Sequence, residues 1–115
     1  MAEGTIDRSV YEDLKTTAGA DFVHELVDTF LAEAPKMIAE LRGALEANEA
    51  ERFRRAAHSL KSNSNTFGAS TLAAMARKLE VGGLAAARAD GGAPIAALSS
   101  EYGRVANALT ELKRA

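Results

Sequence analysis

Apolar side chains recur every three to four residues along almost the whole chain, which is the pattern of helices that bury one face. Five helices are predicted, over about residues 8–17, 21–47, 49–67, 70–89 and 94–113. The second helix is expected to turn Phe22, Leu26 and Phe30 inward, and acidic residues are expected mostly on outward faces. The strict alternation that predicts strands is found nowhere. Four long helices with short connections favour an all-α, antiparallel up-down four-helix bundle, with the short N-terminal helix as an addition.

Several residues are predicted to end or interrupt these helices. Residues 1–4 are expected to form a loose leader, Asp7 to cap the first helix, and Gly19 to end it. Pro35 is expected to bend the second helix; the alternative is two helices that break there, although the apolar stripe keeps its phase across the proline. Gly68 is a natural terminator of the third helix.

Capping residues and glycines bear on the limits of the fourth helix. Ser70 or Thr71 is expected to cap its start. Gly82 and Gly83 weaken its middle, at about 1 kcal/mol each relative to alanine. Pro94 fits the first turn of the last helix.

The third helix carries the residues of chemical interest. At about 100° per residue, five side chains form its buried stripe: Phe53, Ala57, Leu60, Ser64 and Phe67. His58 points roughly 140° away from Phe53 and is therefore expected on the surface. Lys61 and Ser62 follow it by three and four residues, and Arg54 and Arg55 precede it by one turn, so cations and a small polar residue surround an exposed imidazole.

At these residues the chain resembles histidine-containing phosphotransfer (HPt) domains, the carrier modules of multistep two-component phosphorelays. The matching residues are Ala57-His58-Ser59-Leu60-Lys61-Ser62-Asn63-Ser64, then Gly68-Ala69, Leu72 and Leu79-Glu80. Ser62 departs from the pattern, since glycine is usual there. The resemblance implies one helical domain over residues 1–115, a short N-terminal helix over the end of the bundle, and a fourth helix that continues toward Ala89.

The resemblance also implies a function. His58 is expected to accept a phosphoryl group from a receiver-domain aspartyl phosphate and to pass it to another response-regulator aspartate. A neutral imidazole is a good nucleophile near neutral pH, and attack through Nε2 is expected. By family match, Lys61 is expected to stabilise the phosphoryl group; the alternative is an ordinary solvated lysine.

Four further residues are candidates for partner docking: Arg54, Arg55, Ser62 and Asn65. The arginines either steer an acidic receiver domain or merely solvate the helix. Ser62 either hinders docking slightly or adds a hydrogen bond to phosphate. Asn65 lies two turns after His58. It either contacts the partner or is a solvated amide, and the second interpretation is the simpler one. Docking is expected over the His58 helix and part of the second helix, with exposed apolar residues contributing.

Composition excludes several other classes. The chain has 115 residues, a net charge of −2 and no cysteine. It therefore has no disulfide framework, no thiolate metal site and no basic field that would attract nucleic acid. No apolar run reaches 18 residues, and no signal peptide opens the chain, so no membrane association and a cytoplasmic location are expected. His24 has no motif around it and is predicted to be a plain surface residue, and no metal site is expected.

The chain has no glycine-rich phosphate loop and no nucleotide-binding pattern, so a phosphocarrier that is not an enzyme and uses no ATP is expected. No cofactor is expected; the Mg²⁺ should belong to the receiver domain. Partners are the receiver domains of response regulators or hybrid histidine kinases. The start at Met1 and the end at Ala115 favour a free-standing protein, and a monomer is the default.

Two alternatives have distinct signatures. A helical adaptor would bind receiver or kinase domains without carrying phosphate. A histidine-dependent hydrolase would need a second catalytic group, such as an acid, beside His58.

Overall fold

The structure, a computed structural model, describes residues 5–114 and contains five helices. They are α1 (Arg8–Ala18), α2 (Ala20–Ala47), α3 (Ala50–Thr66), α4 (Ser70–Ala89) and α5 (Ala93–Arg114). Each end lies within one residue of its predicted position, and the described residues contain no strand. The leader expected over residues 1–4 lies outside the described part of the chain.

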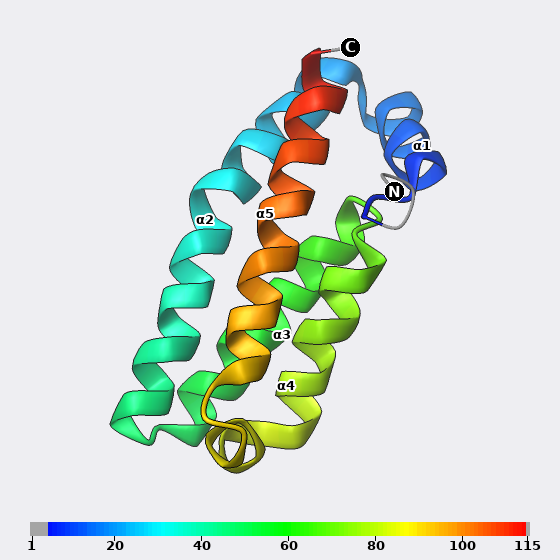
Figure 1. The fold of residues 1–115 in the computed structure, drawn as a ribbon. Helices are drawn as coiled ribbons and strands as arrows, with labels where there is room; N and C mark the ends of the chain where they lie inside the picture. The colour runs from blue at the N-terminus through cyan, green and yellow to red at the C-terminus, as the bar shows by residue number, and fades with distance from the viewer. Residues whose placement is uncertain (1–4, 115) are drawn as a thin grey trace.

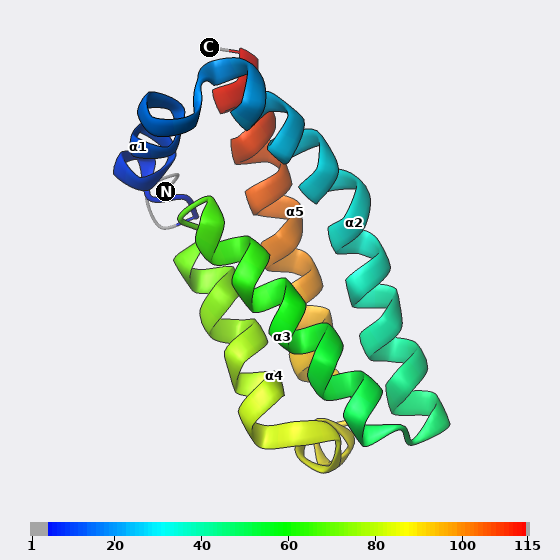
Figure 2. The ribbon, with the colours of Figure 1, turned by 180° about the vertical axis from the view of Figure 1, so that it is seen from behind.

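The four long helices run alternately up and down in an antiparallel bundle, as predicted (Figure 1). Around the bundle the order is α2, α3, α4, α5, so that α3 packs between α2 and α4. Figure 2 shows α3 and α4 side by side at the front of the reversed view. The short helix α1 lies across the end of the bundle where α2 begins. The bundle is 42 Å long.

The core is lined by the predicted faces, with one correction on α2. All five residues of the predicted α3 stripe are buried, from Phe53 to Phe67. On α2, however, Phe22 was expected to face inward and is 50% exposed. The stripe of this helix is centred instead on Val23, Val27 and Phe30, and this rotation carries Phe22 to the surface.

Glu101 is another departure, because acidic residues were expected mostly on outward faces. It lies on the inner side of α5 and is only 4% exposed. Its carboxylate accepts a hydrogen bond from the guanidinium of Arg104 at 2.8 Å, which compensates the buried charge.

Helix α2 passes through Pro35 without interruption, so the alternative of two separate helices is wrong. Proline has no N–H, and the carbonyl of Leu31 therefore lacks its usual partner four residues later. The hydroxyl of Tyr102 on α5 donates a hydrogen bond to that carbonyl at 3.3 Å. A contact between helices thus replaces the hydrogen bond that the proline removes.

Helix α4 differs from the prediction at its start and in its middle. Ala69 holds the N-cap position and no side chain caps the helix, so the expected cap by Ser70 or Thr71 is wrong. Helical structure extends to Ala89 as expected, but Gly83 has φ 79° and ψ 179° and breaks it into two segments. The second segment turns away from the first, as the lower part of Figure 1 shows.

The turn between α3 and α4 is tied to α1. Asp7 caps α1 as predicted, since its carboxylate accepts from the backbone N–H of Ser9 at 3.0 Å. The backbone N–H of Asp7 also donates to the carbonyl of Gly68 at 2.8 Å. Gly68 has φ +74°, and a Cβ there would lie 2.9 Å from the carbonyl oxygen of Asp7. Both the backbone angle and the close approach therefore require glycine.

Within residues 5–114, no helix combines the length and the apolar character that a membrane span needs.

Candidate functional site

His58 lies on the outer side of α3, and 54% of its side chain is exposed. The buried stripe of α3 faces the opposite direction, so the backbone holds this imidazole outward. The prediction that the ring is exposed is confirmed. The other histidine, His24 on α2, is partly buried rather than fully on the surface.

The ring of His58 is held by a carboxylate from the neighbouring helix. Nδ1 of His58 lies 2.7 Å from Oε2 of Glu80 on α4. The other oxygen of the same carboxylate, Oε1, lies 2.9 Å from Nζ of Lys61. Only 15% of the Glu80 side chain is exposed, against 24% for Lys61. One carboxylate thus joins α3 to α4 and fixes two side chains.

This arrangement keeps Glu80 ionised. The hydrogen bond from Lys61, and then that from His58, hold the pKa of the Glu80 carboxyl below its ordinary value. An ionised carboxylate only accepts hydrogen bonds, so Nδ1 of His58 must carry the proton in this contact. In the neutral ring, Nε2 then keeps its lone pair, and it lies on the side of the ring away from Nδ1. The site therefore presents an oriented nucleophile to solvent.

The cations around His58 are held in different ways. Arg54 donates to both oxygens of Glu51, at 3.0 and 2.7 Å. Lys61 is bound to Glu80 and does not reach freely into solvent. Arg55 is exposed, and no carboxylate of residues 5–114 pairs with it. The three predicted cations are therefore not equivalent.

The two predicted polar residues lie on the surface of α3. Ser62 and Asn65 are both exposed. Their carbonyls accept hydrogen bonds from the Thr66 hydroxyl and the Gly68 N–H, at 3.2 and 3.1 Å. Ser62 lies one turn from His58, whereas Asn65 lies two turns away, toward the end of the helix. The structure thus places Ser62 beside the imidazole and Asn65 at the margin of the site.

A groove runs between α2 and α3 beside this site. Two adjoining hollows of about 340 and 150 Å³ form it, and Glu33 and Met37 line both. Arg55 and Ser59 line the first hollow, and Leu26 lines the second. Figure 2 shows α2 and α3 together on the face that bears this groove. The surface therefore offers apolar side chains within a charged rim, on the two helices predicted to dock a partner.

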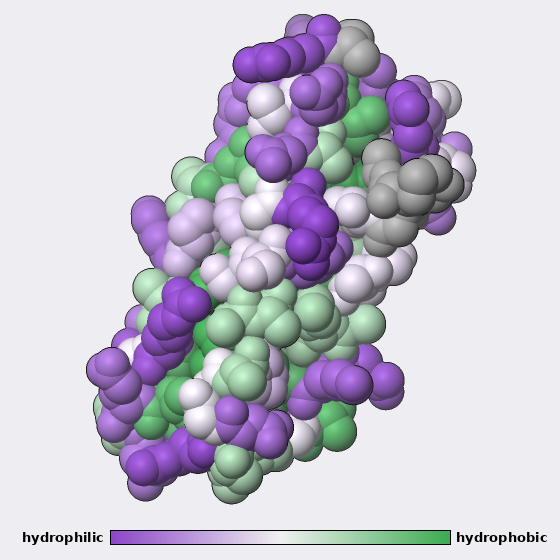
Figure 3. Space-filling model, in the orientation of Figure 1, coloured by the Kyte–Doolittle hydropathy of each residue, from purple (hydrophilic) through white to green (hydrophobic). Residues whose placement is uncertain are grey.

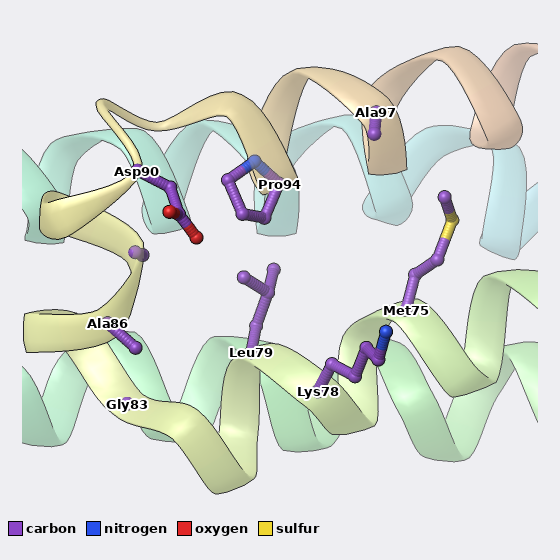
Figure 4. A pocket seen from close by; sticks show the side chains of 9 residues that line it. Met75, Lys78, Leu79, Gly83, Ala86, Asp90, Pro94 and Ala97 are labelled. Atoms are coloured by element: carbon purple, nitrogen blue, oxygen red, sulfur yellow. The ribbon is translucent and has the colours of Figure 1, made fainter.

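Another hollow, of about 420 Å³, lies between α4 and α5. Leu79 and Pro94 point toward each other across it, with Lys78 and Asp90 at its sides (Figure 4). No residue of α3 lines it. Figure 3, which has the orientation of Figure 1, shows pale residues of intermediate hydropathy between hydrophilic ones on this side of the molecule. His58 does not line this hollow, which is therefore not part of the His58 site.

Sequence reasoning missed the partner of the His58 ring. The Leu79-Glu80 pair was noted as part of a motif, but no role followed for the carboxylate. The structure thus supplies the acid that a histidine-dependent hydrolase would need. However, among residues 5–114 no serine hydroxyl forms a hydrogen bond with His58, so no activated hydroxyl nucleophile accompanies the pair.

Comparison with known proteins assigns the family. The family model of the Hpt domain matches residues 25–115. The chain therefore belongs to the Hpt domain family, and its role is phosphotransfer in phosphorelays. Domains of this family are phosphocarriers and not kinases.

Two solved structures share the fold. One is histidine-containing phosphotransfer protein B (HptB) from Pseudomonas aeruginosa PAO1, with a TM-score of 0.86 and 26% identity over 96% of this chain and 95% of that chain. The other is the HPT domain of a sensor hybrid histidine kinase from Shewanella, with a TM-score of 0.72 and 17% identity over 97% of this chain and 95% of that chain. A search by sequence among curated proteins gave no significant match.

Proposed function

We propose that Nε2 of His58 is the atom that carries the phosphoryl group. The observation that supports this most directly is the 2.7 Å contact of Nδ1 with Glu80 on a ring that is 54% exposed. It fixes one nitrogen and leaves the other accessible. An acceptor that meets an aspartyl phosphate inside another protein needs both properties, since such transfer depends mostly on positioning and charge neutralisation.

The step can be written with its atoms and charges balanced. The lone pair of Nε2 forms the N–P bond, while the P–O bond to the receiver aspartate breaks and its electron pair leaves with the carboxylate. The proton on Nδ1 stays in its hydrogen bond to Glu80. The ring becomes positively charged, and the Glu80 carboxylate stabilises this charge at 2.7 Å. The reverse step returns the phosphoryl group to another aspartate.

The groove between α2 and α3 is the surface proposed for receiver domains. Met37 and Leu26 provide partly buried apolar contact, and the charged side chains around them form a polar rim. The Mg²⁺ that the step needs is proposed to be bound by the receiver domain. The carrier itself is proposed to be monomeric and to be located in the cytoplasm. The predicted role of Lys61 stays a prediction, since its contact in this structure is with Glu80.

The decisive experiment uses the two histidines of this chain as test and control. The full chain is incubated with a panel of receiver domains that carry a labelled aspartyl phosphate. We expect base-stable, acid-labile label on the wild type and on His24→Gln, and none on His58→Gln. Binding of receivers without label on any variant would instead identify a helical adaptor.

A further inference from the structure

The cations next to His58 differ in whether their charge is already compensated. Glu51 holds Arg54 through two hydrogen bonds, and Glu80 holds Lys61 at 2.9 Å. Arg55 forms no hydrogen bond or close ion pair with a carboxylate among residues 5–114; its charge acts on that of Glu51, but Arg54 holds both oxygens of that carboxylate. An anion that arrives at Nε2 of His58 therefore finds one neighbouring cation of which no donor is already held by a carboxylate.

The orientation of the His58 ring also favours Arg55 as the cation that an incoming anion meets. Lys61 lies about 60° from His58 around α3 on the side of α4, and Arg55 lies about 60° away on the other side. The contacts agree, because Lys61 reaches Glu80 of α4, whereas Arg55 lines the groove with residues of α2. Since Glu80 holds Nδ1 from the side of α4, Nε2 points away from Lys61 and toward the side of Arg55.

The acidic residues of the groove do not compete for Arg55. Glu33 and Glu40 of α2 line the same hollow. Lys36 lies 3.3 Å from Glu33, and Arg52 binds both oxygens of Glu40 at 3.0 and 2.8 Å. Each glutamate therefore already has a cation of its own, and the Arg55 guanidinium remains available for an incoming anion.

We propose that Arg55 binds the phosphoryl oxygens once Nε2 of His58 is phosphorylated, while Lys61 remains on Glu80. This inference rests on the proposed function, in which His58 is the acceptor. A guanidinium presents paired N–H donors that match two phosphate oxygens, and residues three apart on a helix are neighbours. In this arrangement Glu80 of α4 holds the imidazole ring, and Arg55, on the side that faces α2, binds the transferred phosphoryl group.

The test loads His58 without a protein partner. Phosphoramidate donates its phosphoryl group to histidine as its P–N bond breaks and ammonia leaves. The midpoint of the phosphoryl titration is then read from the ³¹P NMR shift as a function of pH. A bound cation favours the dianion, so we expect Arg55→Gln to raise this midpoint by about one pH unit. Arg42→Gln, the same change at another exposed arginine, should leave it unchanged.

The outcomes separate this inference from the proposed function. A wild-type midpoint in phosphorylated Arg55→Gln overturns the role of Arg55 and leaves His58 as acceptor. A larger rise in Lys61→Gln than in Arg55→Gln also overturns it and assigns the phosphoryl group to Lys61. Failure of phosphoramidate and of every receiver domain to label His58 would overturn both proposals.

Discussion

The two nitrogens of the His58 ring have different surroundings, and this difference defines the site. Nδ1 is fixed by a carboxylate that a second helix provides, and Nε2 forms no hydrogen bond with residues 5–114. The periodicity of α3 was enough to predict which way His58 points, because one helix determines that direction. It could not identify Glu80, because that contact depends on the register of α4 against α3, which no single-helix pattern encodes.

At the residue scale, the pKa of Glu80 leads to a pH-dependent prediction. Its folded-state pKa is lowered from the ordinary value of 4.5, first by Lys61 and then by His58. A lowered carboxyl pKa means that the contribution to stability is present above 4.5 and is lost as the pH falls through the folded value. We therefore expect Glu80→Gln to destabilise the bundle at pH 7 and to have a smaller effect at about pH 3.

Urea unfolding of both proteins at the two pH values measures this effect. Glu111→Gln is the control, because Glu111 is exposed and forms no ion pair with residues 5–114. It should change stability little at either pH. An effect of Glu80→Gln that is equal at both pH values would show that the charge of the carboxylate does not matter.

At the scale of the elements, the helix ranges were predictable, whereas the break in α4 and the rotation of the apolar stripe of α2 were not. The ranges follow from apolar residues at helical spacing over ten or more positions. By contrast, Gly82 and Gly83 both weaken a helix, and the sequence does not show which of them adopts the positive φ. The exposure of Phe22 also could not be foreseen, because neighbouring apolar residues of α2 allow a small rotation of its stripe.

The turn at Gly68 yields a prediction at this scale. Gly68→Ala places a Cβ 2.9 Å from the carbonyl oxygen of Asp7, at a φ of +74° that alanine disfavours. We expect a loss of about 2 kcal/mol in the free energy of unfolding, measured by chemical denaturation. Gly103→Ala is the matched control, since nothing lies within 4 Å of its Cβ position inside α5. It should stabilise the protein by up to about 1 kcal/mol. Equal effects would contradict the close packing of α1 on this turn.

At the scale of the whole molecule, the candidate site and the hollow between α4 and α5 lie on different parts of the surface. The only helix that contributes residues to both is α4. Receiver docking is proposed over α3 and α2, on the face that Figure 2 presents. The hollow of Figure 4 is lined by α4, the loop after it and the start of α5. Substitutions in the two places should therefore have separable effects on phosphotransfer.

Met37 tests the docking surface, because it lines both hollows of the groove. A charge at the centre of an interface opposes desolvation, so we expect Met37→Glu to slow transfer from a receiver domain by about tenfold or more. Labelling by phosphoramidate needs no docking and should proceed at the wild-type rate. Ala97→Glu, in the hollow between α4 and α5, is the control and should leave both rates unchanged. If Met37→Glu transfers normally, receivers dock elsewhere.

The bond between His58 and Glu80 also makes the chemistry depend on tertiary order. A slip of α4 by one turn along α3 would move the carboxylate by about 5.4 Å, beyond hydrogen-bonding distance of the ring. A collapsed chain that kept its helices but lost their fixed packing would still expose the imidazole, but no carboxylate would orient the ring. Competence to receive a signal is thus restricted to correctly assembled molecules, and misassembled copies in a cell would draw little phosphate out of the relay.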